Sequence, residues 1–188
     1  MGLITARIRM MMVIFFLALS GEISAQEITM QSLLREMVDR ENITEFPTEL
    51  PYRTLQASSY NRASVSPDQP GWFADSDGVS CIRTEVNKDG NTEWVLMEDE
   101  GPGAITKIWA VCFYYGLEDT IGANLKIYLD GADEPVICCN FFDLLQGRSF
   151  VQPPLAAETR RAGNCYLPIP YAKGCKAVSY THLRANET

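Results

Sequence analysis

The chain has 188 residues and a formal net charge of −8, from 24 acidic and 16 basic residues. This balance argues against nucleic-acid binding, because that affinity rests on basic contacts to phosphate. It also argues against a basic patch that would hold the protein on a membrane surface. The length is sufficient for one domain with a hydrophobic core.

Residues 1–25 are typical of a secretory signal peptide. Arg7 and Arg9 precede an unbroken apolar run at 10–19, and small residues around Ala25 provide a cleavage point before Gln26. The run is shorter than the ~20 apolar residues that cross a bilayer. We therefore expect an exported protein, periplasmic or extracellular, with no membrane contact after cleavage. An uncleaved membrane anchor is the alternative.

The segment from Thr29 to Arg40 predicts one N-terminal helix that packs across the edge or end of a sheet. Thr29 or Ser32 can cap its start. Its apolar residues fall on one stripe at helical spacing: Leu33, Leu34, Met37 and Val38.

From residue 52 onward the pattern is typical of short strands joined by turns that are rich in Gly, Pro and Asp. Asp89-Gly90 and Asp130-Gly131 are hairpin signals. Residues 141–145 predict a short helical turn, and 63–71 and 149–163 predict loops. The run at 104–115 predicts a central strand covered on both faces. The other expected strands lie at 52–60, 79–86, 92–97, 125–130, 134–139, 165–170 and 175–178. This pattern predicts a mainly β protein with an antiparallel β-sandwich or barrel.

An acidic corner joins two of these strands. Gly101, Pro102 and Gly103 form a rigid junction, and 98–100 place three carboxylates at its mouth. Adjacent residues of a strand point to opposite faces, so we assign no catalytic role to this cluster. A plain turn explains it equally well.

The six cysteines show no Cys-x-x-Cys or Cys/His cluster, and we expect no metal site. Cys112 and Cys138 sit in apolar runs, where cysteine behaves as a small hydrophobe. If any pair is bridged, Cys165 and Cys175 are the best placed, across an expected hairpin.

Residues 178–188 resemble a translated reading frame of a transposase adapter used in preparing sequencing libraries. The expected frame differs only at Asn186, where it would give His. On this interpretation the gene was cut short, the tail is not native, and 26–177 is an incomplete domain. The alternative is an ordinary C-terminal strand. The single histidine, His182, lies in this tail and is given no role.

Five ordered motifs together resemble one protein family. They lie at 58–62, 72–77, 94–109, 125–131 and 166–173. The family is glycoside hydrolase family 172, formerly domain of unknown function 2961, and the resemblance covers about 28–177. It implies a jelly-roll-like sandwich, the first of two successive jelly rolls. It further implies homotrimers or multiples of trimers that cleave fructofuranosyl or arabinofuranosyl linkages with retention, with no cofactor.

In that family the two catalytic glutamates lie in the second half, so no catalytic residue is assigned to this chain. A retaining mechanism needs two carboxyl groups ~5–5.5 Å apart. We therefore expect the fragment alone to be inactive and poorly soluble.

The first jelly roll is expected to contact substrate through a polar loop. Arg62 offers fixed guanidinium donors, and Trp72 and Tyr60 offer ring faces with a polar edge. Asp75 and Asp77 can accept hydrogen bonds from hydroxyl groups.

Two departures from the family pattern and two structural explanations weigh against these roles. The family usually has Asp in place of Asn61 and commonly Asn in place of Asp75. Trp72 with Phe73 could instead be a core plug, and Arg62 could serve a salt bridge. A non-catalytic carbohydrate-binding module and a trimer-assembly module are the alternatives to a hydrolase.

Overall fold

The structure is a computed structural model that describes residues 28–39, 52–74, 80–111, 124–160 and 162–180. Among them no helix is long and apolar enough to cross a membrane. The strands of these segments pair antiparallel, which confirms the predicted mainly β class. The elements in chain order are α2 (Met30–Val38), β1 (Arg83–Val86), β2 (Thr92–Glu100), β3 (Gly103–Ile105), β4 (Ile108–Val111), β5 (Asn124–Leu129), β6 (Ile137–Asn140), α3 (Phe141–Leu145), β7 (Ala156–Thr159), β8 (Ala162–Cys165), β9 (Ile169–Tyr171) and β10 (Gly174–Ser179).

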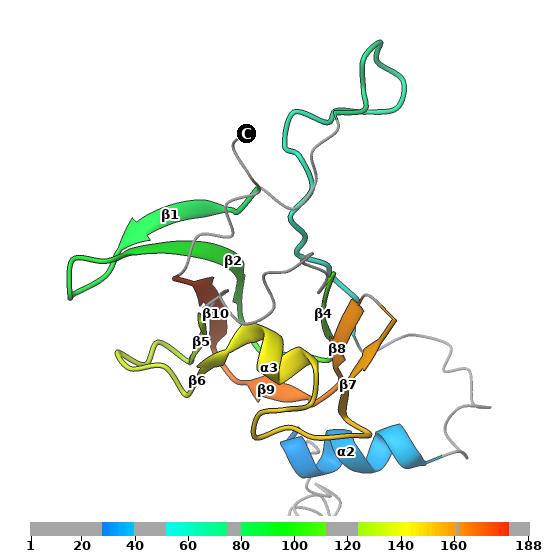
Figure 1. Cartoon of the computed structure of the whole chain (residues 1–188), viewed down its shortest axis with the longest axis vertical. Coiled ribbons are helices and arrows are strands. Elements are labelled where there is room, and N and C mark those ends of the chain that lie inside the picture. Colours follow the sequence, from blue (N-terminus) through cyan, green and yellow to red (C-terminus); the bar gives the residue numbers. More distant parts are fainter. Residues whose placement is uncertain (1–27, 40–51, 75–79, 112–123, 161, 181–188) are drawn as a thin grey trace, which may run out of the picture.

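Three antiparallel sheets build the sandwich (Figure 1). The largest has the order β1-β2-β10-β5-β6, a second has the order β4-β8-β7, and β3 pairs with β9 between them. The hydrophobic core gathers side chains from all three sheets and from α3. Leu125 and Ile127 of β5, at 2% and 0% exposure, meet Leu144 and Leu145 of α3 and Cys165 of β8 in this cluster.

One long antiparallel ribbon connects the sheets. Strands β2, β3 and β4 run opposite β10, β9 and β8, so the ribbon leaves the five-stranded sheet and enters the three-stranded one. At the first bend the Gly101 N–H donates to the Lys173 carbonyl at 2.8 Å. Gly101 has a φ of +88°, which glycine adopts without strain. The acidic corner is therefore one side of a two-stranded bend.

A β-bulge changes which residues of β2 face the core. Ala177 lies opposite Met97, yet the next residue, Val178, lies opposite Val95, which leaves Leu96 as the extra residue. Leu96 and Met97 both pack against the core. Val95 and Val178 are fully buried on the other, outer face. Their register partners there are Arg83 and Lys126, whose long stems can cover apolar surface.

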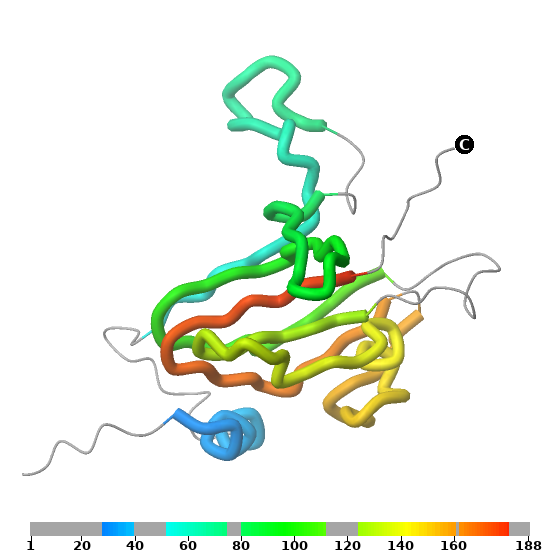
Figure 2. Tube along the Cα trace, turned by 90° about the vertical axis from the view of Figure 1, so that its left-hand side faces the viewer, coloured from blue at the N-terminus to red at the C-terminus, as the bar shows by residue number. Residues whose placement is uncertain are grey.

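The two predicted helical segments are confirmed. Thr29 and Ser32 form a capping box at the start of α2, and Asn140 caps α3 through its side chain. Helix α2 lies at the end of the sandwich away from the 60–74 loop (Figure 2). It has no buried residue, so the tight packing expected for its apolar stripe is not present in the described structure.

Several hairpin predictions are confirmed. β1 and β2 form a hairpin around 87–91, and β5 turns through Asp130 and Gly131, both at positive φ. In β5, Leu125 and Ile127 face inward as expected.

Four strand or loop predictions are wrong. The strand expected at 165–170 is interrupted at 166–168, between β8 and β9. Residues 52–60 form no strand, because all but Ser58 are exposed and the mixed polarity provides no apolar face to bury. The run at 104–115 is broken at Thr106 and Lys107 into β3 and β4, which belong to different sheets; β4 leaves Trp109 exposed, and 112–115 lie outside the described residues. The expected loop at 149–163 contains β7 and the first half of β8, and Val151 and Ala156 are buried.

The bridge considered between Cys165 and Cys175 is not formed. Both are free and buried, on strands β8 and β10 of different sheets. Strand β10 continues through Val178 and Ser179. Whether residues 178–188 come from an adapter is a question about the gene sequence, so that origin stays a prediction.

Candidate functional site

The loop predicted to contact substrate projects from the sandwich in both views (Figures 1 and 2). The Val65 N–H donates to the Trp72 carbonyl at 2.9 Å, and the Ala74 N–H donates to Ser64 Oγ at 3.1 Å. These two contacts close the loop into a narrow finger. A closed finger on a sandwich can hold side chains in fixed positions while leaving them open to solvent.

Two of the predicted binding residues form one unit at the base of this finger. The Arg62 guanidinium lies 3.9 Å from the centroid of the Tyr60 ring. Its Nη2 donates to the Ser58 carbonyl at 2.9 Å. In the described part of the chain these contacts, rather than a carboxylate, hold Arg62. The remaining guanidinium donors can therefore reach a ligand.

A second aromatic unit lies across the finger. The rings of Trp72 and Phe73 pack in an edge-to-face arrangement, with their centroids 5.6 Å apart. They are 45% and 62% exposed, so the core-plug explanation is wrong in this structure. Asp75 and Asp77, the remaining predicted contacts, lie outside the described residues. Exposed ring faces and a fixed guanidinium on one loop suit a sugar, whose C–H faces stack and whose hydroxyls accept hydrogen bonds.

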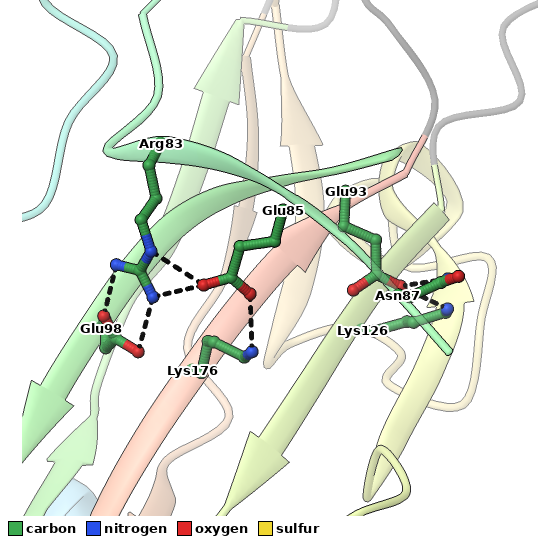
Figure 3. Close-up of polar contacts among 7 residues, drawn as sticks. All are labelled: Arg83, Glu85, Asn87, Glu93, Glu98, Lys126 and Lys176. Carbon is green, nitrogen blue, oxygen red and sulfur yellow. Dashed lines mark hydrogen bonds and ion pairs between the residues drawn. The ribbon is translucent and has the colours of Figure 1, made fainter. Parts of the chain in front are cut away.

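A charged cluster on the outer face of the five-stranded sheet was not anticipated from the sequence (Figure 3). Arg83 binds Glu98 through two hydrogen bonds of 2.6 and 3.0 Å, and its Nε donates to Glu85 at 2.8 Å. The other Glu85 oxygen accepts from Lys176 at 2.9 Å. The hydrogen bond from Lys176, then that from Arg83, lowers the pKa of Glu85. The Arg83 fork likewise lowers the pKa of Glu98.

The same face carries a more buried pair. Glu93 accepts from Lys126 at 2.6 Å and from Asn87 at 3.0 Å. The two charged side chains are 4% and 16% exposed. Burial pushes the pKa of Glu93 upward, but the hydrogen bonds from Lys126 and Asn87 outweigh it and leave the pKa lowered.

This charged cluster does not provide a general acid. Its three carboxylates are paired with three cations, and their lowered pKa values keep them ionised near neutral pH. An ionised, paired carboxylate cannot serve as a general acid. Sequence reasoning could have found part of it, because the hairpin register places Glu85 opposite Glu93. The contribution of Lys176 required the long-range pairing of β10 with β2.

The carboxylates of the acidic corner separate as expected for a strand. Glu98 faces Arg83, whereas Asp99 accepts a 2.6 Å hydrogen bond from the Tyr171 hydroxyl. Among the residues that the structure describes, no group of three His, Cys, Asp or Glu could hold a metal ion. The absence of a catalytic residue from this chain stays a prediction.

The fold and the finger define a β-sandwich module that offers exposed aromatic rings and a fixed guanidinium to a ligand. Over residues 50–185 the chain matches the family model described as GH172 first beta-sandwich domain. It belongs to glycoside hydrolase family 172, as the five motifs predict. Neither curated proteins nor solved structures gave a match.

Proposed function

We propose that this chain is the substrate-contacting first part of an exported, retaining glycoside hydrolase that acts on fructofuranosyl or arabinofuranosyl linkages. Membership in a glycoside hydrolase family supports a carbohydrate substrate. The furanosyl class and retention follow from the motif resemblance. Export rests on the signal-peptide pattern of residues 1–25.

The exposed finger is the observation that carries the proposed contact with substrate. The rings of Tyr60 and Trp72 are 47% and 45% exposed. Apolar rings that remain this open on a hydrogen-bonded loop lose little conformational freedom when a ligand stacks on them. Arg62, held by the Ser58 carbonyl and the Tyr60 ring, supplies directional donors on the same loop.

The carboxylates of the charged cluster support the assignment of catalysis to another part of the protein. A retaining pair requires one ionised nucleophile and one acid/base ~5–5.5 Å apart. Glu85, Glu93 and Glu98 are each bound to a cation instead. We therefore propose that the catalytic glutamates belong to another part of the intact protein, and that these 188 residues alone are inactive. We also propose that the intact protein assembles as homotrimers or multiples of trimers.

The test is an assay of the intact gene product on fructofuranosyl and arabinofuranosyl substrates, with NMR of the first-formed anomer. Trp72→Ala and Arg62→Ala are expected to raise KM by about tenfold or more, the equivalent of roughly 1.4 kcal/mol. Tyr52→Ala is the control, because Tyr52 is an exposed aromatic residue of the same segment that lies outside the finger. An intact protein that leaves all such substrates unchanged would contradict the proposal.

A binding module without hydrolysis is the second candidate. The pairing of every carboxylate on the charged face favours it, because it leaves those groups without acid/base capacity. Retardation of the protein by a polysaccharide, without release of reducing sugar by the intact gene product, would select this candidate. A pure assembly module would oligomerise without any affinity for saccharide.

A further inference from the structure

The outer side of the three-stranded sheet carries a second set of exposed aromatic and polar side chains. Strand β4 alternates cleanly: Ile108 and Ala110 pack against the core, whereas Trp109 and Val111 point outward. Trp109 is 55% exposed, although it stands in the middle of a paired strand. Its register partner on β8 is Asn164, and the partner of Asn164 on β7 is Ala157.

Hydrogen bonds fix the polar groups beside this tryptophan. The Asn164 amide nitrogen donates to the Thr159 hydroxyl at 3.0 Å, and the Tyr166 hydroxyl lies 3.4 Å from the Asn164 carbonyl oxygen. The Lys107 ammonium lies 5.3 Å from the centroid of the Tyr166 ring. The Asn164 amide is therefore held between two hydroxyls at the register position opposite Trp109. One of these hydroxyls belongs to Tyr166, which is 38% exposed.

We propose that Trp109, Tyr166 and Asn164 form a saccharide-binding face that takes a neutral polysaccharide chain. The inference rests on the family's carbohydrate substrate class and not on the furanosyl specificity proposed above. The face uses elements other than the 60–74 finger. It would hold a chain along a flat sheet surface, where strand geometry spaces the side chains regularly.

The composition of this face favours a saccharide over a protein partner. The cores of protein interfaces are depleted in charge and enriched in aromatic and other large apolar groups. Here Trp109 and Val111 are the large apolar side chains at the described outward positions of β4, β7 and β8, and the other side chains there are small or polar. A neutral saccharide needs ring faces for its C–H surface and amide or hydroxyl groups for its hydroxyls. Trp109, Tyr166, Asn164 and Thr159 provide these groups, and Lys107 adds a donor.

The experiment is affinity electrophoresis of the full chain in native gels that contain levan or arabinan, with dextran as the pyranosyl comparison. Trp109→Ala is expected to raise the apparent Kd about tenfold for each polysaccharide that retards the wild-type chain, as loss of a central aromatic contact does. Trp109→Phe keeps a ring and should stay within about threefold of wild type. Asn164→Ala is the second variant, and it should weaken retardation without removing a ring. Phe150→Ala is the matched control, an exposed aromatic residue outside this face.

The outcomes separate this inference from the proposed function. Loss of retardation with Trp72→Ala but not with Trp109→Ala or Asn164→Ala would overturn the inference and leave the finger as the binding site. A wild-type chain that no polysaccharide retards would also overturn it, whereas the hydrolysis assay of the intact protein judges the proposed function separately. If Trp109→Ala lowers the sedimentation coefficient without changing retardation, the face is a protein interface and the inference is wrong. Far-UV circular dichroism confirms that each variant is folded.

Discussion

The Tyr171 hydroxyl donates a 2.6 Å hydrogen bond to the Asp99 carboxylate, which ties β9 to β2 across the first bend of the ribbon. Tyr171 is 7% exposed and lies opposite Gly103 in the register. A Cβ on Gly103 would come within 2.6 Å of the ring carbon Cζ. Burial, and then the hydrogen bond to Asp99, raises the pKa of the Tyr171 phenol. The ring therefore covers a glycine that no other residue can replace without movement.

Gly103→Ala is expected to destabilise the protein by about 1–3 kcal/mol, the usual cost of overpacking a closed site. The double variant with Tyr171→Ala should show coupling, because removing the ring removes the clash. Urea unfolding of the wild type, the two single variants and the double variant measures this coupling free energy. Gly90→Ala is the control: it is strained by its φ of +81° but meets no atom within 4 Å. Its cost should not depend on residue 171, and an equal dependence would contradict the explanation.

The buried pair of Glu93 and Lys126 should contribute more to stability than the exposed pair of Lys88 and Glu134. Glu93→Ala leaves an ammonium that is only 16% exposed without its carboxylate, so we expect a loss of about 1–3 kcal/mol. Lys88→Ala breaks a pair whose side chains are 64% and 72% exposed and screened by solvent, so its effect should be clearly smaller. Urea denaturation at neutral pH compares them. Equal effects would show that burial does not control the strength of these pairs.

The outer-face carboxylates predict acid sensitivity. The folded-state pKa values of Glu85, Glu93 and Glu98 lie below the ordinary glutamate value of 4.5. A lowered folded pKa contributes stability that is present above the unfolded value and is lost as pH falls through the folded value. The urea concentration at the midpoint of unfolding should therefore decrease as the pH falls below about 4.5. Glu98→Gln should lower stability at pH 7 and shrink this drop. An unchanged pH profile in that variant would contradict the role of the Arg83 fork.

How far the fold could be predicted depends on whether the signal is local. Asp89-Gly90 and Asp130-Gly131 place two hairpins correctly because their backbone angles suit only a few residue types. The alternation of Leu125 and Ile127 with polar residues identifies β5, because this signal is also local in the sequence. The break at Thr106 and Lys107 has no local signal. It arises because the ribbon changes sheets there, which depends on the pairing with β8 and β9.

The candidate site shows the same division. Tyr60, Arg62 and Trp72 could be identified from residue chemistry and motif order, and the finger places them in the open. The face around Trp109 could not be identified in this way. An apolar run predicts a buried strand, and only the structure shows that one side of its sheet is uncovered. Its polar partner Asn164 is far away in sequence and comes beside Trp109 only through strand pairing.

The cysteines should differ sharply in reactivity, and this difference tests whether they are free. Cys165 and Cys175 are 1% and 3% exposed, and burial raises the pKa of Cys175 to about 11. Cys138 is exposed on the outer face, opposite Lys126. A thiolate is the reactive form, and buried thiols are inert. Iodoacetamide at pH 8 should therefore label Cys138 in the native protein.

Denaturation without reductant should then expose Cys165 and Cys175 to label, with peptide mass spectrometry as the readout. Cys138→Ser controls for the native signal and should remove it from the peptide that carries residue 138. If Cys165 and Cys175 accept label only after a reductant is added, they are bridged in solution. Such a bridge would join β8 and β10, strands of two different sheets, across the core.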